Sequence, residues 1–180
     1  LRMGFPKALL NAGGKSFLAR ILHSLRDGGA ETVLVVTRSL DDAVADEARR
    51  LEGEVVLNPD PSRGPLSSLQ AGIRHLSEDS PALLLAPVDH PLFSPMTVRA
   101  LITGFAEAGA PVVVPSYDGR RGHPVLFGRL IFPELLEEDL PEGARTVVRR
   151  YLPERLQLPV DDPGILANID TPEEYLKHFP

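Results

Sequence analysis

The stretch 82-ALLLAPVDHP-91 decides the fold class, because a short apolar run leads directly into a stiff polar turn. Five consecutive apolar residues are typical of a strand that is buried on both faces of a sheet. Asp89 follows this run, between Pro87 and Pro91. In open α/β sheets, ligands bind beyond the carboxyl ends of the strands. The stretch therefore predicts a central strand over 82–86 that carries an aspartate at a ligand-binding edge.

The same alternation of apolar runs and amphipathic segments continues along the chain. The run 32–37 (TVLVVT) is apolar and β-branched, as expected for a buried strand. Ser16 and Ser94-Pro95 are helix-start signals, and Thr171-Pro172-Glu173-Glu174 is a capping box. Alternating strands and helices without a repeat or linker predict one α/β domain over 1–180. Further strands are expected over 54–57, 111–114, 125–127 and 156–160, and helices from 16 to 28, over 41–51, from 67, over 94–108, 130–138 and 144–151, and from 171.

The composition limits the class of protein. A chain of 180 residues can bury a sizeable core, and 43% hydrophobic and 24% charged residues are ordinary values for a soluble globular protein. The net charge is −6, with acids and bases interleaved. This argues against a nucleic-acid partner, which would require a basic face. A local cluster such as Arg120-Arg121 could still meet one small anion.

Two absences exclude further classes of chemistry. The chain has no cysteine, so disulfides, thiolate catalysis and zinc–thiolate sites are excluded. The longest apolar run, 82–86, is far too short to span a bilayer, and no signal peptide is visible. We therefore expect a cytoplasmic protein that does not contact a membrane.

Two aspartates are candidate ligands for Mg²⁺, which takes one or two carboxylates together with phosphate oxygens. Asp89 lies on the proline-flanked turn, and its alternative role is to cap nearby N–H groups. Asp170 follows Asn168 and Ile169, and strand alternation would place Asn168 and Asp170 on one face. The alternative for Asp170 is an interaction with the positive end of the helix that follows it.

Two cations, Arg2 and Lys7, flank Met3-Gly4-Phe5-Pro6 near the start of the sequence. They could clamp a triphosphate through charge-assisted contacts, or they could simply be solvated. The loop is not a Walker A motif, because no GxxxxGK[ST] occurs in the chain, and no GxGxxG indicates a dinucleotide site. A P-loop NTPase is therefore not expected.

Three glycine-containing loops are further candidates. Gly64-Pro65-Leu66 precedes Ser67-Ser68 at a helix start, where exposed N–H groups could meet a base edge or an anion; an ordinary loop is the alternative. Gly122-His123-Pro124 is a stiff triplet at the entrance to a strand, and its histidine is either structural or catalytic. Gly143-Ala144-Arg145 combines an N-cap-like glycine with an arginine.

Taken together and in order, these motifs resemble the molybdenum-cofactor nucleotidylyltransferase-like (MobA-like NTP transferase) proteins, in particular the branch that includes molybdopterin cytidylyltransferase. The resemblance covers essentially the whole chain, and the joint order and spacing of the motifs make it specific. It implies a three-layer α/β/α Rossmann-like fold with a mostly parallel sheet, of the nucleotide-diphospho-sugar transferase type. The motifs are Arg2-Met3-Gly4-x-x-Lys7, Asn58-Pro59, Gly64-Pro65-Leu66, Asp89-x-Pro91, Gly122-His123-Pro124, Gly143-Ala144-Arg145 and Asp170-Thr171-Pro172.

The resemblance also implies an activity and a set of roles. The activity is the Mg²⁺-dependent transfer of a nucleoside monophosphate from CTP or GTP to a phosphorylated acceptor, molybdopterin, with release of pyrophosphate. A molybdoenzyme or an insertion chaperone would be a protein partner. The implied residues are Asp89 and Asp170 for the metal, Arg2, Gly4 and Lys7 for the triphosphate, Asn58, Gly64, Pro65, Leu66 and Ser68 for the rest of the nucleotide, and His123 and Arg145 for the acceptor; Arg2, Lys7 and Asp89 would be catalytic.

Three departures from the family pattern bear on these expectations. In the family a first strand and a Gly-rich run precede the loop, whereas this sequence begins at Leu1, so we expect N-terminal residues to be missing from it. Asn168 stands where many relatives have aspartate, which leaves Asp170 as the carboxylate of the C-terminal metal site. Gly64-Pro65-Leu66 resembles the guanylyltransferase branch, while Gly122-His123-Pro124 and Gly143-Ala144-Arg145 resemble the cytidylyl branch, so the choice of base stays open.

The implied reaction needs no nucleophilic side chain. A phosphate monoester has a second pKa near ~6, so the acceptor is largely dianionic at neutral pH. The obstacle is repulsion between this dianion and the triphosphate, which Mg²⁺ together with Arg2 and Lys7 would reduce. Two alternatives stay open. One is a sugar-1-phosphate or isoprenoid-precursor nucleotidylyltransferase with the same chemistry, and the other is a non-catalytic nucleotide-binding module that serves a partner during cofactor insertion.

Overall fold

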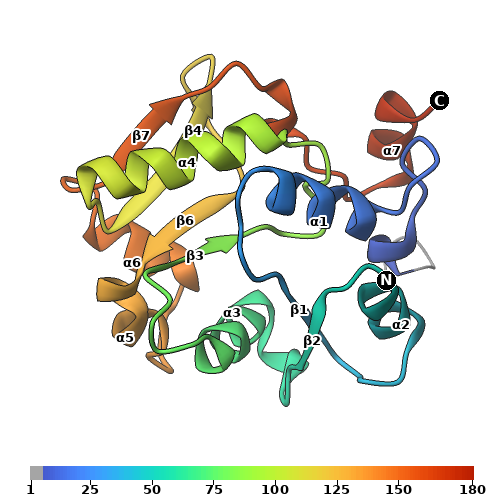
Figure 1. Ribbon diagram of the computed structural model, residues 1–180, viewed down its shortest axis with the longest axis horizontal. Coiled ribbons are helices and arrows are strands. Elements are labelled where there is room, and N and C mark those ends of the chain that lie inside the picture. The colour runs from blue at the N-terminus through green and yellow to red at the C-terminus, as the bar shows by residue number, and fades with distance from the viewer. Residues whose placement is uncertain (1–5) are drawn as a thin grey trace.

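The computed structural model describes residues 6–180, which form a layered α/β structure (Figure 1). The roles predicted for Arg2 and Gly4 therefore concern residues outside the described part. The strands are β1 Leu34–Thr37, β2 Glu54–Leu57, β3 Ala82–Leu85, β4 Val112–Tyr117, β5 Arg120–Arg121, β6 Val125–Gly128 and β7 Leu156–Pro159. The α-helices are α1 Phe17–Asp27, α2 Ala43–Arg50, α3 Pro65–His75, α4 Pro95–Ala108, α5 Phe132–Leu135, α6 Ala144–Arg150 and α7 Pro172–His178. Short 3₁₀ helices are η1 Lys7–Leu9, η2 Pro61–Arg63, η3 Arg129–Ile131 and η4 Pro163–Leu166.

The strands form two hydrogen-bonded sheets. β1 and β2 pair in parallel, with Leu34 opposite Glu54. The larger sheet has the order β3-β6-β4-β5, and β7 pairs in parallel with β4. β6 is antiparallel to β4, because the return from β4 through β5 is too short for a parallel crossover, and it is also antiparallel to β3. The sheet is therefore mixed, and less parallel than the resemblance implied.

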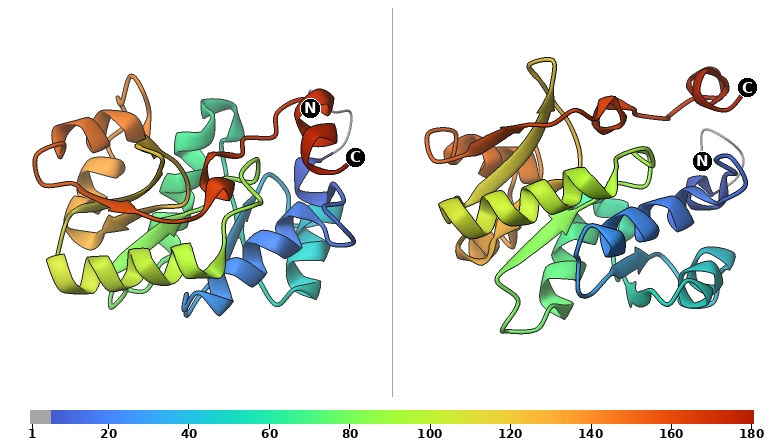
Figure 2. Two further views of the ribbon diagram at one scale, coloured as in Figure 1. Left: turned by 90° about the horizontal axis from the view of Figure 1, so that it is seen from above. Right: turned by 45° about the horizontal axis from the view of Figure 1, so that its top comes forward.

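Helices cover both faces of the larger sheet, and Figure 2 shows the layers from two further directions. On one face, Leu101 of α4 packs against Val113 and Leu126. On the other face, Val112 and Phe127 pack in a cluster with residues of α3, α5 and α6. Alternate residues of β4 thus point into opposite layers, which confirms the three-layer α/β/α arrangement. Within residues 6–180, none of the helices combines the length and the apolar composition needed to cross a membrane.

The helix starts predicted from serine and threonine caps are confirmed. Ser16 Oγ accepts a hydrogen bond from the Ala19 N–H at 3.0 Å at the start of α1. Ser94 Oγ accepts one from the Thr97 N–H at 3.2 Å at the start of α4. The capping box of α7 is complete. The Thr171 side chain accepts a hydrogen bond from the Glu174 N–H, and the Glu174 side chain accepts one from the Thr171 N–H. These caps satisfy N–H groups that the first turn of a helix leaves unpaired.

Candidate active site

The turn after β3 presents Asp89 at the edge of the larger sheet. The His90 N–H donates to the Pro87 carbonyl at 3.1 Å, and the Ile169 N–H donates to the Asp89 carbonyl at 2.8 Å. The Oδ1 atom of Asp89 is buried and has no hydrogen-bond partner within residues 6–180. A buried carboxylate oxygen without a donor is unfavourable, so this atom is suited to meet a cation.

Asp170 lies beside Lys7, which comes from the other end of the chain. Lys7 Nζ forms an ion pair with Asp170 Oδ1, and Asn168 Nδ2 donates to Asp170 Oδ2 at 2.9 Å. The Asp170 backbone N–H donates to Glu174 Oε2 at 2.6 Å, as part of the capping at the start of α7. Asn168 therefore helps to orient Asp170, a role that sequence analysis did not predict.

The two aspartates belong to one site. The Ile169 N–H that bonds the Asp89 carbonyl comes directly before Asp170, so the two loops lie side by side. Both carboxylates act electrostatically on His90 and raise its pKa, while Lys7 lowers it. Burial of the ring is nevertheless the largest effect, and the pKa of His90 is lowered overall. Burial therefore favours the neutral form of His90, although two carboxylates lie near it.

His123 is stacked on His90, with ring centroids 4.6 Å apart and an interplanar angle of 51°. Burial, then the neighbouring His90 and Arg145, lower the pKa of His123 to about 4. Gly122 makes this placement possible, because a Cβ added there would lie 2.2 Å from the Ile165 carbonyl oxygen. The His123 N–H donates to that carbonyl at 3.0 Å, which fixes the histidine against η4.

The starts of α3 and α6 lie next to each other, on the side of the candidate site that was predicted to face the acceptor. Gly143 precedes α6 with a φ of 59°, and a Cβ added there would lie 3.8 Å from the Cβ of Leu66. Arg145 follows in the first turn of α6, is exposed, and influences the pKa of His123. The structure therefore brings together two of the predicted glycine loops, Gly64-Pro65-Leu66 and Gly143-Ala144-Arg145.

The predicted nucleotide side is organised by Asn58. Asn58 is buried, and its Nδ2 atom donates to Ser67 Oγ at 2.9 Å and to Ser68 Oγ at 3.0 Å. Its Oδ1 atom accepts from the Asp60 N–H at 3.0 Å. Asn58 and Ser68 thus contact each other and hold the loop against α3. Gly64, with a φ of 80°, caps α3 without a side chain, which leaves the helix start open to a ligand.

The donor set fits a hard divalent cation. Asp89 offers a buried oxygen without a donor among the described residues, and Asp170 is held in place by Asn168 and Lys7. Carboxylate oxygens are the ligands that Mg²⁺ and Mn²⁺ prefer. Over the part of the chain that the structure describes, no group of three or more acidic or histidine side chains forms a closed metal cage. Two carboxylates are nevertheless sufficient where substrate phosphates supply the other ligands.

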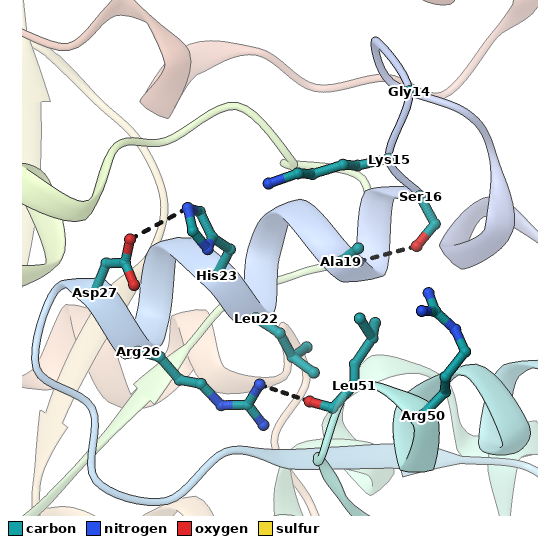
Figure 3. Close-up of a pocket in the computed structure, with 10 residues that line it drawn as sticks. All are labelled: Gly14, Lys15, Ser16, Ala19, Leu22, His23, Arg26, Asp27, Arg50 and Leu51. Carbon is teal, nitrogen blue, oxygen red and sulfur yellow. Dashed lines mark hydrogen bonds and ion pairs between the residues drawn. The ribbon is translucent and has the colours of Figure 1, made fainter.

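A groove between α1 and α2, about 410 Å³ in volume, lies apart from these residues (Figure 3). Several of its basic side chains form hydrogen bonds or ion pairs with other groups of the protein. Arg26 donates to the Leu51 carbonyl, and Arg50 pairs with Glu47. His23 lies 3.2 Å from Asp27. None of the residues predicted for the site lines this groove, so the edge at Asp89 is the better candidate for the active site.

Sequence reasoning missed the participation of His90. It lies next to Asp89 on the same turn, and its ring links the carboxylates to His123. A signal was present, because a histidine between an aspartate and a proline on a stiff turn has little freedom to leave the site. The contact with His123 itself depends on the fold and has no local signature.

The chain is similar to known proteins over most of its length. A family model described as "MobA-like NTP transferase domain" matches residues 1–156. A molybdenum cofactor guanylyltransferase of Rhizobium meliloti is 30% identical, over 96% of this chain and 83% of that protein. A phosphoenolpyruvate guanylyltransferase of Rubrobacter xylanophilus is 34% identical, over 87% of this chain and 75% of that protein.

The fold is also found in solved structures. The crystal structure of Rv0371c from Mycobacterium tuberculosis in complex with manganese has a TM-score of 0.76. It is 23% identical, and the match covers 98% of this chain and 92% of that one. At this identity the likeness supports the fold alone.

Proposed function

This chain belongs to the MobA-like NTP transferase family, and we propose that, as a nucleotidyltransferase, it transfers GMP from GTP to the phosphate of molybdopterin. The observation that carries the proposal is the meeting of Asp89, Asp170 and Lys7 at one sheet edge, joined by the 2.8 Å bond from Ile169 to Asp89. Two carboxylates and an ammonium group suit a metal-bound triphosphate.

The step is a displacement at the α-phosphorus of the nucleotide. An oxygen of the acceptor phosphate forms the new P–O bond, the bond to the β-phosphate bridging oxygen breaks, and pyrophosphate leaves with its electron pair. Asp89 and Asp170 would hold a divalent cation, which supplies positive charge to the phosphates. Lys7 would contact phosphate oxygens, and the open start of α3 at Gly64 would face the base. His123 and Arg145 would face the acceptor.

We propose GTP rather than CTP as the nucleotide substrate, because two relatives are named as guanylyltransferases. One of these acts on phosphoenolpyruvate by its name, so that acceptor is the second candidate. The test is pyrophosphate release with Mg²⁺ or Mn²⁺, with GTP or CTP, and with either acceptor. Release that requires GTP and molybdopterin supports the proposal. If pyrophosphate release requires phosphoenolpyruvate, then phosphoenolpyruvate and not molybdopterin is the acceptor. If no combination of nucleotide and acceptor releases pyrophosphate, the chain is better explained as a non-catalytic nucleotide-binding module.

The Asp89→Asn variant tests the metal assignment. It keeps the size of the side chain and removes its charge, so we expect kcat to fall at least about 10²-fold. Asp79→Asn is the matched control, because Asp79 is exposed and precedes β3, at the opposite end of that strand from Asp89. Near-normal turnover of a folded Asp89→Asn protein would contradict the assignment.

A further inference from the structure

Lys7 and Asn168 together engage both carboxylate oxygens of Asp170. Lys7 Nζ forms an ion pair with Oδ1, and Asn168 Nδ2 donates to Oδ2 at 2.9 Å. The Lys7 and Asp170 side chains are 22% and 38% exposed, so the protein shields part of this ion pair from water. Asp89 differs, because its buried Oδ1 atom has no hydrogen-bond partner within residues 6–180. One carboxylate of the candidate metal site therefore offers an oxygen without a donor among the described residues, whereas the other already holds an ammonium group.

The ammonium group of Lys7 competes with a divalent cation for Asp170. A cation within about 4–6 Å of a carboxylate typically weakens proton binding to that carboxylate by a factor of about ten or more. A divalent cation carries a larger charge than a proton and is repelled more strongly by the ammonium group. Asn168 does not offset this effect, because its amide occupies the second oxygen of Asp170 and adds no negative charge. In the free protein, Lys7 should therefore keep a divalent cation from binding tightly between Asp89 and Asp170.

The phosphates of a nucleotide would give Lys7 another partner. A triphosphate carries more negative charge than one carboxylate, and a lysine ammonium group binds phosphate as a point charge. We propose that Lys7 is an internal counter-ion, which blocks the metal site of the free protein and releases Asp170 when a nucleotide draws the ammonium group to its phosphates. This inference rests on the proposed function, in which two aspartates hold the cation and Lys7 contacts the phosphates. Nucleotide and cation then bind cooperatively, because the nucleotide removes the competitor of the cation.

The first test is a titration of the full chain with Mn²⁺ alone, in which EPR measures the unbound ion. We expect weak binding by the wild type and at least about tenfold tighter binding by Lys7→Met. Lys7→Arg keeps a positive charge beside Asp170 and should bind Mn²⁺ as weakly as the wild type. Lys15→Met is the matched control, because Lys15 is exposed and its replacement removes the same charge. A Kd for Mn²⁺ that changes no more in Lys7→Met than in Lys15→Met would overturn the proposal.

The second test measures the reciprocal effect and keeps Lys7 in place. GTP binding is measured by calorimetry in the presence of EDTA, so that no divalent cation takes part. Asp170→Asn weakens the hold on Lys7 and should bind GTP about tenfold more tightly than the wild type. Asp89→Asn removes the same charge from the same edge without releasing Lys7, so its gain should be smaller. Equal gains in the two variants would mean that the lost negative charge alone explains the effect, which would also overturn the proposal.

These measurements separate this proposal from the proposed function. If Asp89→Asn weakens Mn²⁺ binding while Lys7→Met leaves it unchanged, the metal assignment stands and the counter-ion role of Lys7 is wrong. If neither the wild type nor Lys7→Met binds Mn²⁺, the metal assignment and the counter-ion role both fail. A failure to transfer GMP to molybdopterin would change neither titration, because no acceptor is present in them.

Discussion

Replacing His123 by glutamine tests the electrostatics of the site through stability. Burial, His90 and Arg145 lower the pKa of His123 from 6.5 to about 4. Between these values the folded protein keeps the ring neutral, whereas the unfolded chain binds a proton. The stabilising contribution is therefore fully present above pH 6.5 and is lost as the pH falls toward about 4.

The magnitude follows from the size of the change. Lowering the pKa from 6.5 to about 4 changes the free energy of unfolding by about 3 kcal/mol across this pH range, since one pKa unit corresponds to about 1.4 kcal/mol. At about pH 4.5 the wild type should have lost roughly 2–3 kcal/mol of this contribution. Glutamine does not titrate, so the His123→Gln protein should lack this part of the pH dependence.

The assay is urea unfolding followed by circular dichroism at about pH 7.5 and about pH 4.5. The unfolding free energy should fall less between these two pH values in His123→Gln than in the wild type, by roughly 2–3 kcal/mol. His178→Gln is the control, because His178 is exposed at the end of α7. An identical pH dependence in wild type and His123→Gln would refute the reasoning.

Three further changes should affect stability. Asp162→Ala removes the acceptor of the Thr97 hydroxyl at 2.6 Å and of two backbone N–H groups, and should lower the unfolding free energy by about 3 kcal/mol in urea titrations. Gly122→Ala places a Cβ 2.2 Å from the Ile165 oxygen and should lower Tm by at least about 4 °C in a thermal melt. Thr171→Ala removes the capping box of α7 and should cost about 1 kcal/mol, measured by the same urea titration.

Local signals predicted much of the fold. The apolar run at 82–86 became β3, and the caps at Ser16 and Ser94 start α1 and α4 as expected. The helix predicted over 130–138 is instead η3 followed by a short α5 that ends at Leu135. Pro133 lies in the first turn of α5, where the absence of an N–H group is tolerated.

Long-range pairing could not be predicted in this way. β6 pairs with β3, which lies far from it in the sequence, and neither strand's own residues specify that partner. The internal role of Asn58 required knowledge that Ser67 and Ser68 lie beside it. Family resemblance named Asp89 and Asp170, while their meeting through Ile169 is a property of the folded chain.

The ion pair between Lys7 and Asp170 joins side chains 163 residues apart. During synthesis at about 5–20 residues per second, the strands and helices up to α4 emerge well before Asp170 does. Closing so long a loop costs entropy that the earlier packing must offset. We therefore expect the nascent chain to acquire its layers first and its catalytic competence last.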